Sequence, residues 1–152
     1  MVQVVLMLHV LFGVLAIMIA VAVLVYLVNV KEQNIPRIKN LSILVALSTI
    51  LSYLIGGYWY VTYYTPERDI IKAGPWPWAH TFFMEAKEHI FFVLLFLSIY
   101  LPIVVYKDSL LKSEENRKLA LIVVVFIILI GLAVDGSGAI ISRGLIMSLL
   151  GR

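Results

Sequence analysis

The chain has 152 residues, of which 62% are hydrophobic and 14% are charged, and its formal net charge is +3. Soluble domains carry roughly a quarter charged residues, so this composition excludes a soluble globule and predicts an integral protein of a lipid bilayer. The chain has no cysteine, which excludes disulfides, thiolate metal sites and covalently attached c-type haem. It also has no basic stripe with interleaved aromatic residues, so we expect no nucleic-acid partner.

The long apolar runs predict an all-α fold, a four-helix transmembrane bundle in a single domain that covers residues 1–152. Pro36 should keep the first connection from being helical throughout, and Pro66 should lie in a longer loop at about 61–78. Ser113 is the expected N-cap of the last helix. The predicted helices cover residues of about 2–29, 41–60, 79–106 and 119–142.

Basic residues gather in two of the connections, at residues 31–39 and 107–118. The positive-inside rule places both connections in the cytoplasm, so the N and C termini should lie outside. The loop between the second and third helices should also lie outside, since its two basic residues are balanced by two acidic ones. We therefore expect an integral plasma membrane protein of a prokaryote with both termini on the outer side.

The segment from Trp76 to His89 opens the third helix and carries two histidines, two glutamates and a lysine. Ionisable residues at the edge of a transmembrane helix are costly and usually face a partner, a cavity or a cofactor. Counting about 1.5 Å per residue from the cytoplasmic helix ends, His9, His89 and Asp135 fall near one level at the outer edge of the hydrocarbon core. This shared level predicts a polar site there.

Helix periodicity assigns these residues to faces. Glu85, His89 and Phe92 share one stripe of the third helix, with Glu88 on its flank, whereas His80 lies half a turn away. On the first and fourth helices, the stripes that carry a histidine or an aspartate are otherwise made of small residues. Such small-residue stripes most often serve close helix packing, and the ionisable residues could equally form a solvated helix mouth.

The leading hypothesis is a b-type haem held by His9 and His89, since imidazoles from facing helices are common axial ligands in membrane bundles. Phe92 would pack against the macrocycle, and Arg143 would meet its propionates. With these inward-facing histidines, the chain resembles the small four-helix membrane-bound b-type cytochromes. The resemblance covers the architecture of the whole chain and rests on no sequence motif. It implies electron transfer between a membrane quinone and an outer-face partner.

Two alternatives stay open. A non-haem site for zinc, iron, manganese or copper(II) could use the mixed imidazole and carboxylate donors near the same level. Those candidate ligands are His9, Glu85, Glu88, His89 and Asp135. Alternatively, the chain is a non-catalytic membrane anchor subunit of a larger complex, and its tryptophan-rich outer loop is the surface on which other membrane or outer-face subunits dock.

Overall fold

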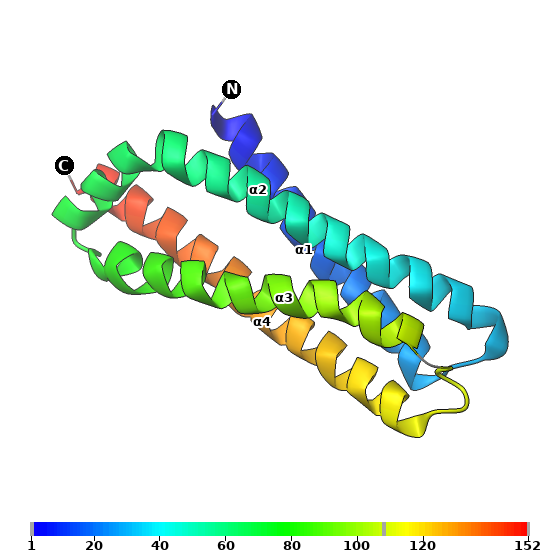
Figure 1. The fold of residues 1–152 in the computed structure, drawn as a ribbon. Helices are drawn as coiled ribbons and strands as arrows, with labels where there is room; N and C mark the ends of the chain where they lie inside the picture. The colour runs from blue at the N-terminus through cyan, green and yellow to red at the C-terminus, as the bar shows by residue number, and fades with distance from the viewer. Residues whose placement is uncertain (1, 108, 152) are drawn as a thin grey trace.

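The computed structural model describes residues 2–107 and 109–151, and in this part of the chain every regular element is a helix. Four long helices run alternately up and down in an elongated bundle (Figure 1). They are α1 (Val2–Val28), α2 (Ile35–Ala73), α3 (Glu85–Lys107) and α4 (Glu114–Leu150). A short 3₁₀ turn, η1 (Glu32–Asn34), precedes α2, and a π-helix, η2 (Ala79–Met84), leads into α3. All four long helical stretches are long and apolar enough to cross a membrane.

Helix α2 is longer at both ends than the predicted segment. It begins at Ile35 because Pro36 lies in the first turn, where a missing N–H removes no intrahelical hydrogen bond. It then continues through Pro66, although an internal proline costs about 3 kcal/mol. Burial of Tyr64 and Ile71 on either side offsets this cost. The predicted outer loop is therefore reduced to residues 74–78.

Helix α4 is also longer than expected, and it begins where the capping signal predicted. The Ser113 side chain accepts a hydrogen bond from the backbone N–H of Asn116 at 3.2 Å, which confirms Ser113 as the N-cap. The Asn116 amide in turn donates to the carbonyl oxygen of Val104 on α3 at 3.0 Å. One short polar segment thus caps α4 and joins it to the end of α3.

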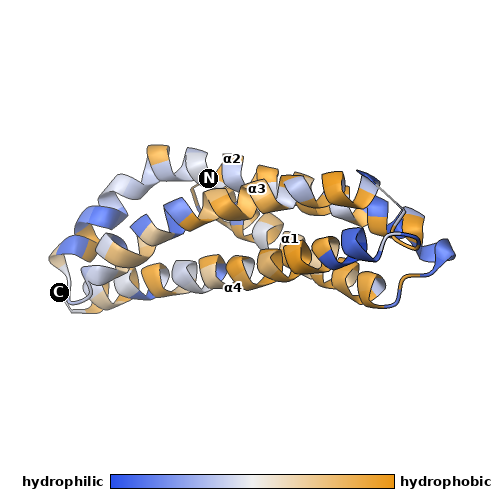
Figure 2. Cartoon of the chain, turned by 60° about the horizontal axis from the view of Figure 1, so that its bottom comes forward, coloured by the Kyte–Doolittle hydropathy of each residue, from blue (hydrophilic) through white to orange (hydrophobic). Residues whose placement is uncertain are grey.

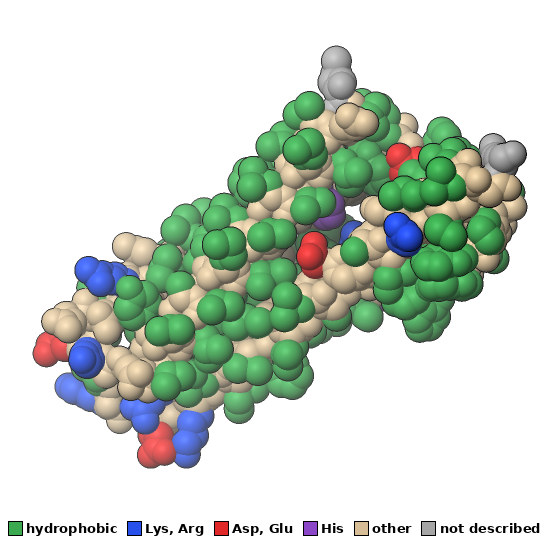
Figure 3. Space-filling model, turned by 180° about the vertical axis from the view of Figure 1, so that it is seen from behind, with side chains coloured by type: hydrophobic (Ala, Val, Ile, Leu, Met, Phe, Trp, Pro, Cys, Tyr) green, Lys and Arg blue, Asp and Glu red, His purple; other side chains and the backbone are tan. Residues whose placement is uncertain are grey.

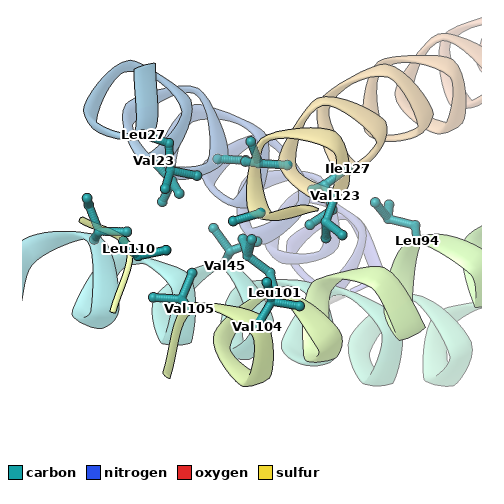
Figure 4. Packing of buried hydrophobic residues seen from close by; sticks show 14 of the residues in the cluster. Val23, Leu27, Val45, Leu94, Leu101, Val104, Val105, Leu110, Val123 and Ile127 are labelled. Carbon is teal, nitrogen blue, oxygen red and sulfur yellow. The ribbon is translucent and has the colours of Figure 1, made fainter. Parts of the chain in front are cut away.

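The hydrophobic core is divided into two clusters along the bundle. The larger cluster lies toward the α1–α2 and α3–α4 connections and draws on all four helices (Figure 4). Val23, Val45, Leu101 and Val124 are completely or almost completely buried there. Figure 2 shows the hydrophobic middle of the bundle and the hydrophilic connections at one end.

The second cluster lies at the opposite end of the bundle and joins α2, η2 and α4. It contains Trp59, Tyr64, Ile71, Ala79, Met84 and Ile141. At about 1.5 Å per residue, the 39-residue α2 is about 58 Å long, which exceeds a hydrocarbon core of about 30 Å. In contrast, α1 has only 27 residues and its N-terminal end separates from α4 (Figures 1 and 2). Around the start of α1, the bundle therefore changes from four helices to three.

Glycine at position 144 allows α4 to approach η2. A Cβ atom at Gly144 would lie 2.7 Å from the Cβ of Ala79, closer than real side chains pack, whereas a Cβ at Gly136 would meet nothing within 4 Å. We predict that Gly144→Ala lowers the thermal unfolding midpoint of the detergent-solubilised protein.

Gly136→Ala is the matched control on the same helix. It should leave the midpoint unchanged or raise it, because alanine is favoured over glycine in a helix by about 1 kcal/mol. Equal midpoints for the two variants would contradict the close packing of α4 on η2.

Candidate functional site: two joined cavities around His9

His9 on α1 is fixed to α2 through Ser52, which is 2% exposed. The imidazole Nδ1 lies 2.8 Å from the carbonyl oxygen of Ser52, and the Ser52 hydroxyl donates to the carbonyl oxygen of His9 at 3.0 Å. A carbonyl oxygen only accepts hydrogen bonds, so Nδ1 carries the hydrogen and donates it. The other ring nitrogen, Nε2, is then left with a lone pair that can accept a hydrogen bond or bind a metal.

The imidazole of His9 lies against a glycine of α2. A Cβ atom at Gly56 would lie 2.5 Å from Nδ1 and 2.7 Å from Cε1 of His9, so any side chain at this position displaces the ring. At the adjacent Gly57, a Cβ would meet nothing within 4 Å. Gly56 therefore makes the space that the ring of His9 occupies, and Gly57 does not.

Two cavities meet at His9. The first, about 290 Å³ in volume, lies between α1 and α4 and reaches α2 and α3. The second, about 300 Å³ in volume, lies between α1, α2 and α3. Both volumes are at the lower end of the range for small-molecule sites, about 300–1,000 Å³. The residues that line both cavities are Leu6, His9, Trp59, Met84, Lys87 and Phe91.

Two buried polar atoms at this site lack hydrogen-bond partners within the described residues. They are the indole Nε1 of Trp59 and the carboxyl Oε1 of Glu88. Trp59 is 7% exposed and lines both cavities, and Glu88 lines the second. Leaving a buried donor or acceptor unsatisfied costs about 1–3 kcal/mol. An unpaired donor and an unpaired acceptor at the same cavities are therefore evidence that a ligand supplies the missing partners.

Charged side chains of both signs border the first cavity, which Lys87 reaches from α3 and Asp135 from α4. The Lys87 ammonium lies against Gly138, 3.3 Å from where a Cβ on that glycine would be. Figure 3 shows a histidine, an acidic and a basic side chain together at a hollow on one face of an otherwise largely hydrophobic surface. The site thus combines a neutral imidazole, an ammonium and a carboxylate within apolar walls.

The π-helix η2 precedes the residues that α3 contributes to the site. A π-helix is rare and is found mostly at functional sites. Its last residue, Met84, begins an inward-facing stripe that continues through Lys87, Phe91 and Leu94. Within η2, His80 is buried, and its Nδ1 lies 3.1 Å from the hydroxyl of Tyr64, so this histidine stabilises the second core cluster.

His89 does not lie with His9. It is exposed, it lines neither cavity, and its Nδ1 bonds the carbonyl oxygen of Glu85 at 2.7 Å. The inward stripe of α3 passes through Lys87 and Phe91, and a residue two positions from either is rotated by about 200° to the outside. The stripe of Glu85, His89 and Phe92 therefore points outward, opposite to the sequence prediction.

The remaining predicted haem contacts divide in the same way. Phe92 is 46% exposed but borders the second cavity, whereas Arg143 is exposed and lines neither cavity. Of the predicted axial pair, only His9 contributes to the cavities, so the described residues provide one imidazole ligand there instead of two.

The predicted metal cluster is not assembled. Across residues 2–107 and 109–151, no three histidine, aspartate or glutamate side chains come together closely enough to hold a metal ion. His9, Glu88 and Asp135 line the cavities, but Glu85 and His89 are exposed. The outward rotation of these two α3 residues removes them from the proposed ligand set.

Trp59 and Lys87 are the two site residues that sequence reasoning missed. The pattern placed Trp59 among interfacial aromatic residues because the second helix was expected to end at about residue 60. Once α2 is seen to continue to Ala73, Trp59 lies in mid-helix and inside the bundle. Comparison of the chain with protein-family models, with curated proteins and with solved structures gave no match.

The contact of His9 with Gly56 gives a direct test of the site geometry. We predict that Gly56→Ala displaces the imidazole and breaks the hydrogen bond from Nδ1 to Ser52. The ¹⁵N-labelled histidine spectrum of the protein in detergent should then lose the signal of the hydrogen-bonded Nδ1 of His9.

Gly57→Ala is the control and should keep that signal, because the position faces open space. A Gly56→Ala protein with an unchanged histidine spectrum would show that the ring of His9 does not lie against α2.

Proposed function

We propose that this protein is a membrane redox protein whose working site is the pair of cavities around His9, and that it binds the headgroup of a membrane quinone there. The observation that carries this proposal is the unpaired indole N–H of Trp59, buried beside His9 and Lys87. A quinone offers carbonyl oxygens that accept hydrogen bonds, and it has a flat apolar ring. Hydrogen-bond donors in an otherwise apolar cavity match that chemistry.

Both redox states of such a ligand find partners among these side chains. The N–H of Trp59 and the ammonium of Lys87 can donate to the carbonyl oxygens of the quinone, and the unpaired Oε1 of Glu88 can accept from a hydroxyl of the quinol. Aromatic walls suit the ring, since Tyr53 and Phe91 stack with centroids 5.7 Å apart at the second cavity. Reduction of the quinone takes up two electrons and two protons.

The cavity side chains can exchange those protons with the quinone. His9 has a lone pair on Nε2, and Glu88 and Asp135 are carboxyl groups. The electrons would pass between the quinone and a partner at the outer face. The partner is assigned to that face because the two basic connections are proposed to lie in the cytoplasm and both termini outside.

The orientation can be tested with single cysteines because the chain has none of its own. We predict that a cysteine at Lys112, in the α3–α4 connection, is blocked by an impermeant maleimide only after intact cells are opened. A cysteine at Lys72, near the end of α2, should react in intact cells. The opposite labelling pattern would invert the proposed orientation.

Trp59→Phe tests the proposed ligand, because it removes the indole N–H and keeps an aromatic ring. Loss of one hydrogen bond of about 0.5–1.5 kcal/mol should weaken binding of a short-chain quinone roughly two- to tenfold. The measurement is calorimetric titration of the detergent-solubilised protein with the quinone.

Trp78→Phe is the matched control, since Trp78 is exposed and lines neither cavity, and its affinity should equal that of the unaltered protein. Equal weakening by the two substitutions would remove Trp59 from the binding site. If the unaltered protein binds no quinone, the anchor-subunit hypothesis takes precedence.

A second candidate is a b-type haem with His9 as an axial ligand. The hydrogen bond from Nδ1 to the Ser52 carbonyl favours it, because histidines that bind metals usually donate their other ring N–H to such an acceptor. The described residues place no second histidine at the cavities, so the fit is partial. When bound, a haem supplies a one-electron carrier.

An optical spectrum of the purified protein, oxidised in air and then reduced with dithionite, tests the haem. With a haem present, the Soret band should disappear in His9→Ala and persist in His89→Ala, because only His9 lines the cavities. A Soret band that is lost in His89→Ala instead would restore the bis-histidine pair predicted from the sequence. A featureless spectrum from unaltered protein that still binds quinone would eliminate the haem.

A further inference from the structure

Helices α1 and α4 touch at one level and separate above it. At Gly131 a Cβ atom would lie 2.9 Å from Cγ1 of Ile17, so the two helices pack there as closely as a glycine allows. Toward the N-terminal end of α1, the helices diverge (Figure 1), and the first cavity lies in the space between them. Gly131 and Ile17 thus form the floor of a slot that widens toward His9.

The slot opens sideways from the bundle. Among the residues that line the first cavity, Val10 on α1 and Asp135, Ala139 and Ser142 on α4 are exposed, so they form the rim of the opening. Small residues line the slot behind that rim. They are Gly13, Ala16, Gly131 and Gly138.

The surface around this opening is suited to lipid. On α1, Leu11 is 58% exposed and Val14 is 37% exposed, and on α4, Leu132 is 55% exposed. Both helices are apolar enough to span a membrane, so these side chains meet hydrocarbon. A molecule that reaches the first cavity through the slot therefore comes from the bilayer.

We infer that the slot between α1 and α4 is a lateral entrance for a ligand with a long apolar tail, and that the tail lies in it while the headgroup reaches His9, Lys87 and Trp59. This inference rests on the proposed function and restricts its ligand to tailed, lipid-soluble quinones. The buried, unpaired N–H of Trp59 places the polar end of the ligand at the inner end of the slot.

The division of the two cavities assigns each part of the ligand. The second cavity has aromatic walls at Tyr53, Tyr60 and Phe91, which suit a flat ring. The slot of the first cavity has small residues and aliphatic side chains, which leave a narrow groove for a flexible chain. The residues shared by the cavities lie between these parts, where the polar groups of a quinone ring are attached.

The test compares two probes on the same protein. One is a quinone without a tail, and the other carries the same headgroup with a ten-carbon tail. In the unaltered protein, the tailed probe should bind at least tenfold more tightly, since each buried methylene adds to affinity. Calorimetric titration in detergent gives both dissociation constants.

Ala139→Leu narrows the rim of the slot from α4, and Val10→Phe narrows it from α1. Each should weaken binding of the tailed probe about tenfold, equivalent to lost burial of roughly two methylene groups. Binding of the tail-less probe should stay within about twofold, which also shows that the variant is folded and the inner site intact.

The controls place the same substitutions on the same helices outside the slot. Ala133→Leu and Val14→Phe alter exposed residues that do not line the cavity, and they should leave both affinities unchanged. Equal weakening of both probes in Ala139→Leu, or no benefit from the tail in the unaltered protein, would overturn the lateral entrance while the proposed quinone site stands. If neither probe binds the unaltered protein, the proposed function fails as well.

Discussion

The contact between His9 and α2 determines the form of the site. Ser52 binds both the ring and the backbone of His9, Gly56 gives the ring its space, and Gly13 lies where a Cβ would be 3.4 Å from the Ser52 hydroxyl. These contacts hold the outer part of α1 against α2 and leave α4 without a close neighbour at that level. Because protein interiors are close-packed, the separation of α1 from α4 creates a cavity there. The position of one histidine is thus coupled to the opening of the site.

The fold followed from the sequence because its main signal is simple. Four apolar stretches of sufficient length predict four helices, and the Ser113 cap marks the start of the last one. The extensions of α2 and α4 were missed because local rules treat Pro66 as a breaker, whereas burial of Tyr64 and Ile71 decides the outcome. Tertiary packing that overrides a local preference cannot be read from the pattern of residues along the chain.

The site was predicted in part. Depth counting correctly selected His9 and Asp135, which line the same cavity, and it also selected His89, which is exposed. Depth gives the level of a residue but not its direction, and on α3 several faces are apolar enough to be buried. The polar residue that α3 directs into both cavities is Lys87, which the sequence pattern assigned to a solvated helix mouth. The partners of Trp59 and Glu88 lie on other helices, so only the folded chain shows that these groups are unpaired.

The distribution of polar groups favours a ligand from the membrane over a transported ion. Polar cavity residues gather at one level, while the half of the bundle near the connections is filled by the aliphatic core (Figure 4). A path for an ion needs polar groups across the whole hydrocarbon layer, and this core interrupts any such path. A redox ligand that enters from the bilayer requires no such path, and only its electrons and protons need to leave.

The central claim is that a quinone headgroup occupies the cavities around His9, and photo-crosslinking tests it most directly. A quinone with a photoreactive group on its ring would be irradiated with the purified protein, and the labelled peptides would be identified by mass spectrometry. The account predicts labels in the part of α1 around His9 and in residues 84–92, with loss of labelling when unmodified quinone is added in excess. Labels confined to lipid-facing residues such as Val25 or Ile103, or labelling that excess quinone does not reduce, would contradict it.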